Sequence, residues 1–260
     1  MYAISVDFFV KKNEKIDFKK IIEDLIKNGC VYEGEYSLDN HSRIYSDLKE
    51  AKEEISNATK ICSLRFKIDN MQFSLLYRPA VKNKNKLKSI QIFNPLDIIE
   101  RKFSVVNFYF DRSFVGMTAT KEQKENVKNV IKLAKTIYEN LHCYTASYGE
   151  EEDFVNMIYK PLADGKVKSF CWINIFPPGM LTEREKKIIL GKTKVFHKEE
   201  LDDGAVLLVI ANNPIFWGDA QNSCDHYKVV REIKKLLGWK ITEYEMNPGH
   251  QIKENGGEHK

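Results

Sequence analysis

The sequence predicts an α+β protein with a largely antiparallel sheet that is packed by amphipathic helices on one face. Two segments of alternating apolar and polar residues, 62–68 and 71–77, flank Asp69-Asn70, which is the strongest hairpin signal in the chain. Residues 121–141 carry an apolar stripe at helical spacing opposite a charged face, as expected for a helix with one side on a sheet. Tight hairpins join antiparallel strands, so these observations together favour the α+β class.

The chain opens with a strand and a helix. Residues 2–10 are rich in β-branched and aromatic side chains, which predicts a strand. Residues 18–26 repeat apolar side chains at helical spacing and end before the Asn-Gly pair at 28–29, a suitable C-cap. A shorter helix is predicted over 47–58, with the Ser-Asp pair at 46–47 available to cap its start.

The later elements follow the same two periodicities. The helix over 121–141 begins with a capping box formed by Thr120 and Gln123. A last helix over 224–237 ends at Gly238. Further strands are predicted at 88–93, 103–110, 167–176 and 204–211, the last an uninterrupted apolar run that suits a central strand.

Residues 1–115 are predicted to form an N-terminal α+β half with a strand, helices and the hairpin, and residues 116–246 a C-terminal α+β half. The alternative, that the two halves form a single domain, stays open at this point. The tail, residues 247–260, contains Pro, Gly and charged residues and almost no apolar side chain. It cannot bury enough surface to offset its ordering entropy, so we expect it to be mobile.

Composition points to a cytoplasmic protein without a membrane span. The 41 basic and 37 acidic residues leave a formal net charge of +4, which does not by itself predict a polyanionic partner. The apolar stretch 205–211 is far shorter than the roughly 20 residues that span a bilayer. The first residues lack the basic region of a secretory signal, and the five cysteines are odd in number and scattered, so reduced, mostly buried thiols are expected.

No motif of catalysis or of cofactor binding occurs, and we therefore expect no catalytic residues and no cofactor. The nucleophile elbow G-x-S-x-G and a glycine-rich phosphate loop are both missing from the sequence. Thiolate and imidazole ligands are adjacent at His142-Cys143 and at Cys224-Asp225-His226. Neither pair is accompanied by C-x-x-C or H-x-x-x-H spacing, so no metal site is predicted.

Two alternatives belong to other functional classes. An enzyme site could form only in the fold, for example from Glu150, Asp202 and His226. A nucleic-acid interface could use the alternating lysines between Lys82 and Lys88. No stacking aromatic residues are interleaved with these lysines, which disfavours nucleic acid as a partner.

Aromatic and acidic segments in the C-terminal half predict a protein-binding surface. Residues 170–179 join an aromatic strand to a Pro-Pro-Gly turn, and residues 212–219 are a loop with large apolar side chains. Rigid aromatic side chains are favoured at protein interfaces, which suits a contact role for these segments. The alternative is that the same side chains fill the core and serve packing alone. The predicted contact residues are Tyr148, Glu150, Glu151, Glu152, Asp153, Trp172, Phe176, Phe216, Trp217 and Asp219.

Residues 145–240 resemble a group of bacterial polymorphic-toxin immunity proteins and related uncharacterised families. The resemblance rests on segments 172–178 and 200–209, on Gly191, on the Asn-Pro turn at 213–214 and on the Leu-Leu-Gly end at 236–238. Members of the group carry a glycine before the two prolines of the first segment, whereas here the glycine follows them.

The resemblance implies a cytoplasmic binding protein that neutralises a toxin by occluding it, without chemistry of its own. Inhibitors of nucleases are often acidic, so the mildly basic chain disfavours a nuclease as the target. We therefore expect a non-catalytic protein-binding module whose partner is a protein, such as a toxin domain. The identity of that partner and the oligomeric state stay open.

Overall fold

The computed structural model describes residues 3–38, 41–44, 47–58, 61–80, 99, 102–116, 120–148, 158–165, 167–214 and 220–246. Its strands are β1 (Ala3–Lys11), β2 (Val31–Leu38), β3 (His41–Ile44), β4 (Cys62–Ile68), β5 (Met71–Arg78), β6 (Phe103–Asp111), β7 (Tyr144–Tyr148), β8 (Ile173–Phe176), β9 (His197–Glu200) and β10 (Val206–Val209). Its helices are α1 (Phe18–Lys27), α2 (Leu48–Ser56), α4 (Lys121–Leu141), α5 (Lys160–Ala163), α6 (Glu183–Lys192), α7 (Ala220–Leu237) and α8 (Glu243–Met246), with a 3-10 turn, η2 (Arg112–Phe114).

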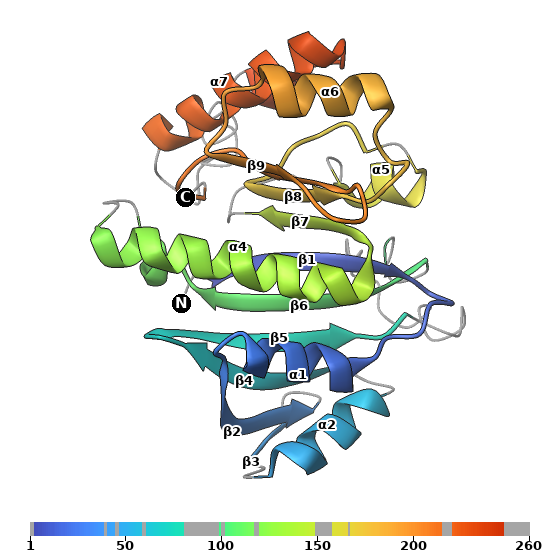
Figure 1. Ribbon diagram of the computed structural model, residues 1–260, viewed down its shortest axis with the longest axis vertical. Coiled ribbons are helices and arrows are strands. Elements are labelled where there is room, and N and C mark those ends of the chain that lie inside the picture. Colours follow the sequence, from blue (N-terminus) through green and yellow to red (C-terminus); the bar gives the residue numbers. More distant parts are fainter. Residues whose placement is uncertain are drawn as a thin grey trace, which may run out of the picture.

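Within these ranges the strands form one antiparallel sheet in the order β3-β2-β4-β5-β6-β1-β7-β8-β10-β9 (Figure 1). The strand at its centre, β1, pairs with β6 along one edge and with β7 along the other. The hydrogen-bonded sheet therefore runs without interruption from the N-terminal into the C-terminal part of the chain. The division into halves at 115/116 stays a prediction.

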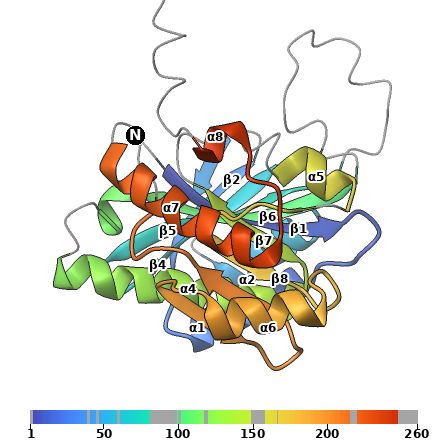
Figure 2. The ribbon, with the colours of Figure 1, turned by 90° about the horizontal axis from the view of Figure 1, so that it is seen from above.

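Two apolar cores lie on opposite faces of the sheet. In β1, Val6 and Phe8 point into the core that α1, α2 and α4 cover, whereas Phe9 points into a second core. Successive side chains of a strand alternate between faces, so both faces of β1 need a cover. Side chains of α5, α6 and α7 provide it over the C-terminal strands. Seen from above, α1 and α4 lie on one side of the molecule, and α5 and α8 on the other (Figure 2).

The predicted α+β class with a largely antiparallel sheet is confirmed, and amphipathic helices pack against a face of that sheet. The structure adds the second helical layer on the opposite face. The hairpin at Asp69-Asn70 is confirmed as β4-β5, and the helix over 121–141 as α4, including its capping box. The helix predicted over 224–237 is α7, which begins earlier, at Ala220, and ends before Gly238, whose positive φ of 71° suits a glycine. The short helix α8 follows it, so α7 is not the last helix of the described residues.

Two predicted strands are shorter than expected. Of the segment 204–211, only residues 206–209 form a strand, β10. Only residues 173–176 of the segment 167–176 form a strand. Before residue 173, a side chain takes the place of strand pairing. The side chain of Asn174 accepts a hydrogen bond from the N–H of Cys171 and donates one to the carbonyl of Cys171. The strand predicted at 88–93 and the tail 247–260 lie outside the described residues.

No helix in the described part of the chain combines the length and the apolar character needed to cross a membrane.

The β4-β5 turn offers a test of the fold. Asp69 has a positive φ of 51°, and its Oδ2 accepts a hydrogen bond of 2.9 Å from Asn129 Nδ2 of α4. We expect Asp69→Ala to lower the free energy of unfolding by about 1–3 kcal/mol, because it loses this bond and places a Cβ-only side chain in the left-handed region. Urea unfolding measures the change, and Asp69→Asn, which tolerates that backbone, should cost less than half as much. Equal losses would show that the turn conformation contributes nothing.

Candidate functional site

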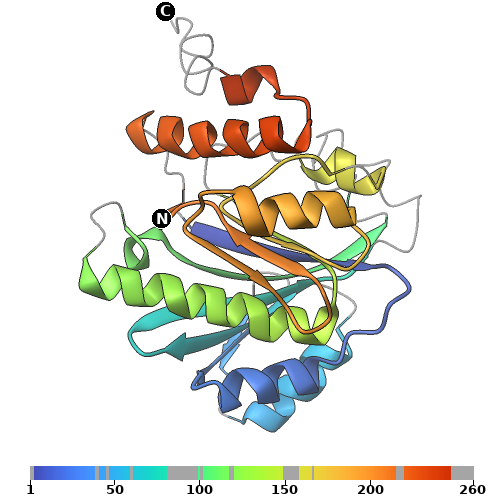
Figure 3. The same cartoon turned by 45° about the horizontal axis from the view of Figure 1, so that its top comes forward.

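A groove of about 610 Å³ lies between the exposed side of α4, the end of α1 and the terminal strand β9. Figure 3 shows how the backbone is arranged there, with the green helix α4 running past the orange strands of the C-terminal part of the sheet. We refer to it as the α4-β9 groove. Its walls come from segments that are distant in the sequence, since residue 28 and residue 199 both border it. The lining residues are Asn28, Lys128, Ile131, Lys132, Lys135, Thr136, Glu139, Phe196, His197 and Glu199.

Polar contacts fix the two walls of the groove relative to each other. Lys135 Nζ of α4 lies 2.7 Å from Glu199 Oε1 of β9. Lys132 Nζ donates a hydrogen bond of 2.8 Å to the carbonyl of Asn28 at the end of α1. Both lysines stand on one face of α4 because residues three or four apart are neighbours on a helix. The groove is therefore bordered by contacts that already exist in the free chain.

The same groove exposes apolar surface. Phe196 is 49% exposed directly before β9, an unusual position for a large aromatic side chain. Ile131 of α4 packs at the edge of the first core and also lines the groove. The site thus combines exposed apolar area with a charged border, which is the composition of surfaces that bind proteins.

A smaller hollow of about 220 Å³ continues the groove toward the β9-β10 turn, sharing Lys135, Glu139 and Glu199 with it. There Asp203 Oδ2 accepts a hydrogen bond of 2.8 Å from the hydroxyl of Tyr138 and lies 2.9 Å from His142 Nδ1.

Asp203 joins the turn to the end of α4. Partial burial opposes ionisation of Asp203, but its hydrogen bonds with the N–H of Ala205, with His142 and with Tyr138 together hold its pKa below the ordinary value. His142 caps α4 in the left-handed conformation, with φ of 45°. This Tyr-Asp-His cluster fastens the β9-β10 turn to α4 and so sets one end of the groove.

The described thiols do not complete a nucleophilic site. Cys30, Cys62, Cys143 and Cys171 are buried and form no disulfide with one another. Burial raises the pKa of Cys30 and of Cys62 to about 12, and it raises that of Cys143 as well. These thiols are protonated at neutral pH and therefore poor nucleophiles. Within the described ranges no group of three or more His, Cys, Asp or Glu side chains is arranged to hold a metal ion.

The structure places two predicted contact residues in the core. Trp172 and Phe176 are each 1% exposed. Trp172 Nε1 donates a hydrogen bond of 2.8 Å to the carbonyl of Ala211, and Phe176 packs against Phe170 and Tyr144. The prediction that these two side chains contact a partner is therefore wrong for this structure, because Phe176 of β8 and Trp172 directly before it fill the two cores.

The remaining predicted contact residues are not tested by the structure. Tyr148 ends β7, paired with Ser5 of β1, but its side chain lies outside the described set. The acidic run 150–153 and the residues Phe216, Trp217 and Asp219 also lie outside the described residues. The lysines between Lys82 and Lys88 lie outside the described residues as well.

The trio weighed as an enzyme site does not assemble at the surface. His226 is 1% exposed in α7, whereas Asp202 is exposed in the β9-β10 turn. Glu150 lies outside the described residues. Both ring nitrogens of His226 lack a hydrogen-bond partner, and burial alone lowers its pKa to about 3. His226 is thus a neutral core side chain.

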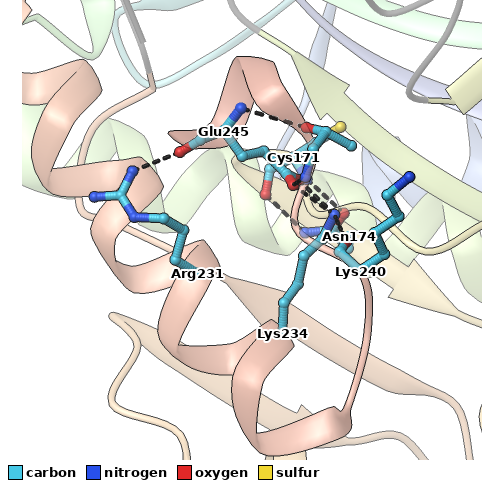
Figure 4. Close-up of polar contacts among 7 residues, drawn as sticks. Cys171, Asn174, Arg231, Lys234, Lys240 and Glu245 are labelled. Atoms are coloured by element: carbon cyan, nitrogen blue, oxygen red, sulfur yellow. Dashed lines mark hydrogen bonds and ion pairs between the residues drawn. The ribbon is translucent and has the colours of Figure 1, made fainter. Parts of the chain in front are cut away.

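A buried ion pair fastens α8 to α7. Lys234 and Glu245 are 1% and 0% exposed, and Lys234 Nζ lies 2.8 Å from Glu245 Oε2 (Figure 4). The same carboxylate accepts a hydrogen bond of 2.8 Å from the N–H of Thr242, while Arg231 donates to the carbonyl of Glu245. Burial lowers the pKa of Lys234, and Glu245 offsets part of that shift. Both charged groups are buried and contact each other between the two helices, so we assign this pair a structural role.

Comparisons of the chain with protein-family models, with curated proteins and with solved structures give no match. Function is therefore argued from the α4-β9 groove.

The contribution of the buried ion pair to stability can be measured with two variants. Lys234→Met leaves the Glu245 carboxylate buried without its counter-charge, and we expect the free energy of unfolding at pH 7 to fall by about 3–5 kcal/mol. Replacing both partners, with Lys234→Met and Glu245→Leu together, should recover most of that loss because no unpaired charge remains. Guanidinium unfolding compares the variants. A double variant no more stable than the single one would contradict the proposed cause.

His226 generates a pH test. Its pKa is lowered from 6.5 to about 3 in the folded chain, so the unfolded chain binds a proton first as the pH falls. The contribution to stability is complete above pH 6.5 and decreases below it, by about 2 kcal/mol at pH 5. Urea unfolding at pH 7 and pH 5 measures this loss. The variant His226→Phe should lose about 2 kcal/mol less than the wild type over the same interval, and an identical loss would assign the acid sensitivity to other groups.

Proposed function

We propose that the chain is a non-catalytic protein-binding module whose partner occupies the α4-β9 groove. The observation that carries the proposal is the exposed Phe196 beside a groove of about 610 Å³ with charged borders. Exposed aromatic side chains in a hollow provide much of the binding energy of protein interfaces, and polar borders provide specificity.

The rigidity of the groove supports the same role. The ion pair between Lys135 and Glu199 and the cluster around Asp203 hold β9 against α4 in the free chain. A preformed surface loses little conformational entropy on binding, which raises affinity. Burial raises the pKa of Cys30, Cys62 and Cys143, so these thiols support a binding role rather than a catalytic one.

An immunity-type role is the specific form of the proposal. The resemblance of residues 145–240 to toxin immunity proteins supports a partner that is a toxin domain neutralised by occlusion. The segment covers Phe196 and β9, which form one wall of the groove. Among the described residues, Cys30, Cys62, Cys143 and Cys171 are buried thiols, which supports a reducing, cytoplasmic environment.

The test is affinity capture of host proteins on the tagged full chain, with two matched variants. Phe196→Ser and Leu236→Ser each remove a large exposed apolar side chain, but Leu236 lies on α7 and is not among the residues that line the groove. We expect Phe196→Ser to reduce retention of a stoichiometric protein partner at least tenfold, and Leu236→Ser to leave it unchanged. Retention that both variants preserve, or the absence of a stoichiometric partner on the wild type, would overturn the proposal.

A further inference from the structure

Strand β9 is the last strand of the described sheet and has β10 on one edge only. A terminal strand presents backbone N–H and C=O groups that can pair with another chain. Proteins that use such an edge for recognition add an extended segment of the partner as a further strand. The direction of the backbone N–H and C=O groups decides which residues of β9 could pair with such a segment.

Two hydrogen bonds fix that direction. The N–H of Ile210 donates to the carbonyl of Trp172, which turns residue 210 toward β8, and alternation then turns residues 207 and 209 toward β9. At the other end of the hairpin, the N–H of Leu201 donates to the carbonyl of Ala205. Residues 197 and 199 therefore pair with β10.

The intervening residues of β9 use the outer edge. Lys198 and Glu200 present their backbone groups away from β10, because hydrogen-bonding direction alternates along an antiparallel strand. Their side chains are occupied elsewhere, since Lys198 Nζ donates to the carbonyl of Thr193 and Glu200 pairs with Lys186. The side chains of these two residues are therefore held by contacts within the chain, beside their outward backbone groups.

Three lysines of α4 line the groove beside this edge, Lys128, Lys132 and Lys135. Lys128 is paired with Glu125 and Lys135 with Glu199, each at 2.7 Å, so Lys132 is the lysine of the three whose observed contact is not a carboxylate. Lys132 is hydrogen-bonded to a neutral carbonyl, so its charge is not cancelled by that contact. An acidic occupant complements this lining.

We propose that the occupant of the α4-β9 groove is an extended acidic segment of the partner, which adds to the outer edge of β9 as a further strand and lies over the lysine face of α4. This inference rests on the proposed function and specifies the partner's chemistry. Side chains of the added strand alternate between faces, so every second residue faces α4 on the side of His197 and Glu199. An acidic residue is expected at the alternate position next to Lys132, whose ammonium group contacts a neutral carbonyl.

The probe is a library of random dodecapeptides displayed on phage, panned on the immobilised full chain. We expect enrichment of peptides without proline that carry Asp or Glu at alternate positions and β-branched residues between them. For the best peptide, hydrogen exchange of the complex should show added protection at the amides of Lys198 and Glu200. Enrichment of basic or proline-rich peptides, or no enrichment at all, would overturn the inference.

Two pairs of variants test the edge and the charge separately. Lys198→Pro removes the outward N–H at an edge position where proline is tolerated, and Lys198→Ala keeps it. We expect at least tenfold weaker peptide binding for Lys198→Pro and less than a threefold change for Lys198→Ala. Lys132→Glu should weaken binding at least tenfold, whereas Lys121→Glu, on the same helix but not among the residues that line the groove, should not. Circular dichroism verifies that each variant is folded.

The outcomes separate this inference from the proposed function. Loss of the captured partner with Phe196→Ser, together with full retention by Lys198→Pro and Lys132→Glu, would keep the binding module and refute strand addition. Peptide binding that Lys198→Pro and Lys198→Ala weaken equally would also refute it, because the backbone N–H would then be irrelevant. Alternating acidic peptides that depend on both Lys132 and the N–H of Lys198 would support it even before the natural partner is identified.

Discussion

The pairing of β1 on both of its edges is the constraint on which the rest of the structure depends. Its nine residues pair in full with β6 and over five residues with β7. A strand in this position is buried on both faces. Each of its side chains must therefore be apolar or have a hydrogen-bond partner. In β1, Val6 and Phe8 meet the core under α1 and α4, whereas Phe9 meets the core that α5, α6 and α7 complete.

The groove follows from this arrangement. Helix α4 crosses the face of the central strands, and the sheet continues beyond it through β7, β8 and β10 to β9 (Figure 1). Because strands twist relative to their neighbours, the end of the sheet comes forward and brings β9 beside the exposed side of α4. The ion pair between Lys135 and Glu199 then joins two segments that are 64 residues apart. A binding surface arises where an edge strand and a helix meet, and it does so without a special loop.

Sequence periodicity was a reliable guide where one face of an element is buried and the other is not. The β4-β5 hairpin and α4 have such patterns. The hairpin was predicted with its Asp69-Asn70 turn, and the helix with its capping box. Helix α6 carried a readable signal as well, the capping box of Thr182 and Glu185, although its short apolar stretch was not assigned. Strand β9, with the sequence His-Lys-Glu-Glu, has no apolar alternation, since one of its edges and both of its faces are partly solvated.

The aromatic segment 170–179 shows why two of the predicted contact residues, Trp172 and Phe176, were misassigned. Large aromatic side chains are equally suited to a core and to an interface, and only burial distinguishes the two. Trp172 and Phe176 fill the cores on either side of β8, while Phe196, in a segment without any aromatic run, is left at the surface. Local sequence does not record which strand becomes the last one in a sheet.

By itself, the sequence determined the class of fold, the position of its main helix and hairpin, and the lack of a catalytic motif, because these depend on local periodicity and on residue types at fixed spacing. Only the tertiary structure decided that Lys135 meets Glu199, that Asp203 joins Tyr138 to His142, and that β9 ends the sheet next to α4. Such contacts depend on strand order and twist, which are properties of the whole packed chain rather than of any segment.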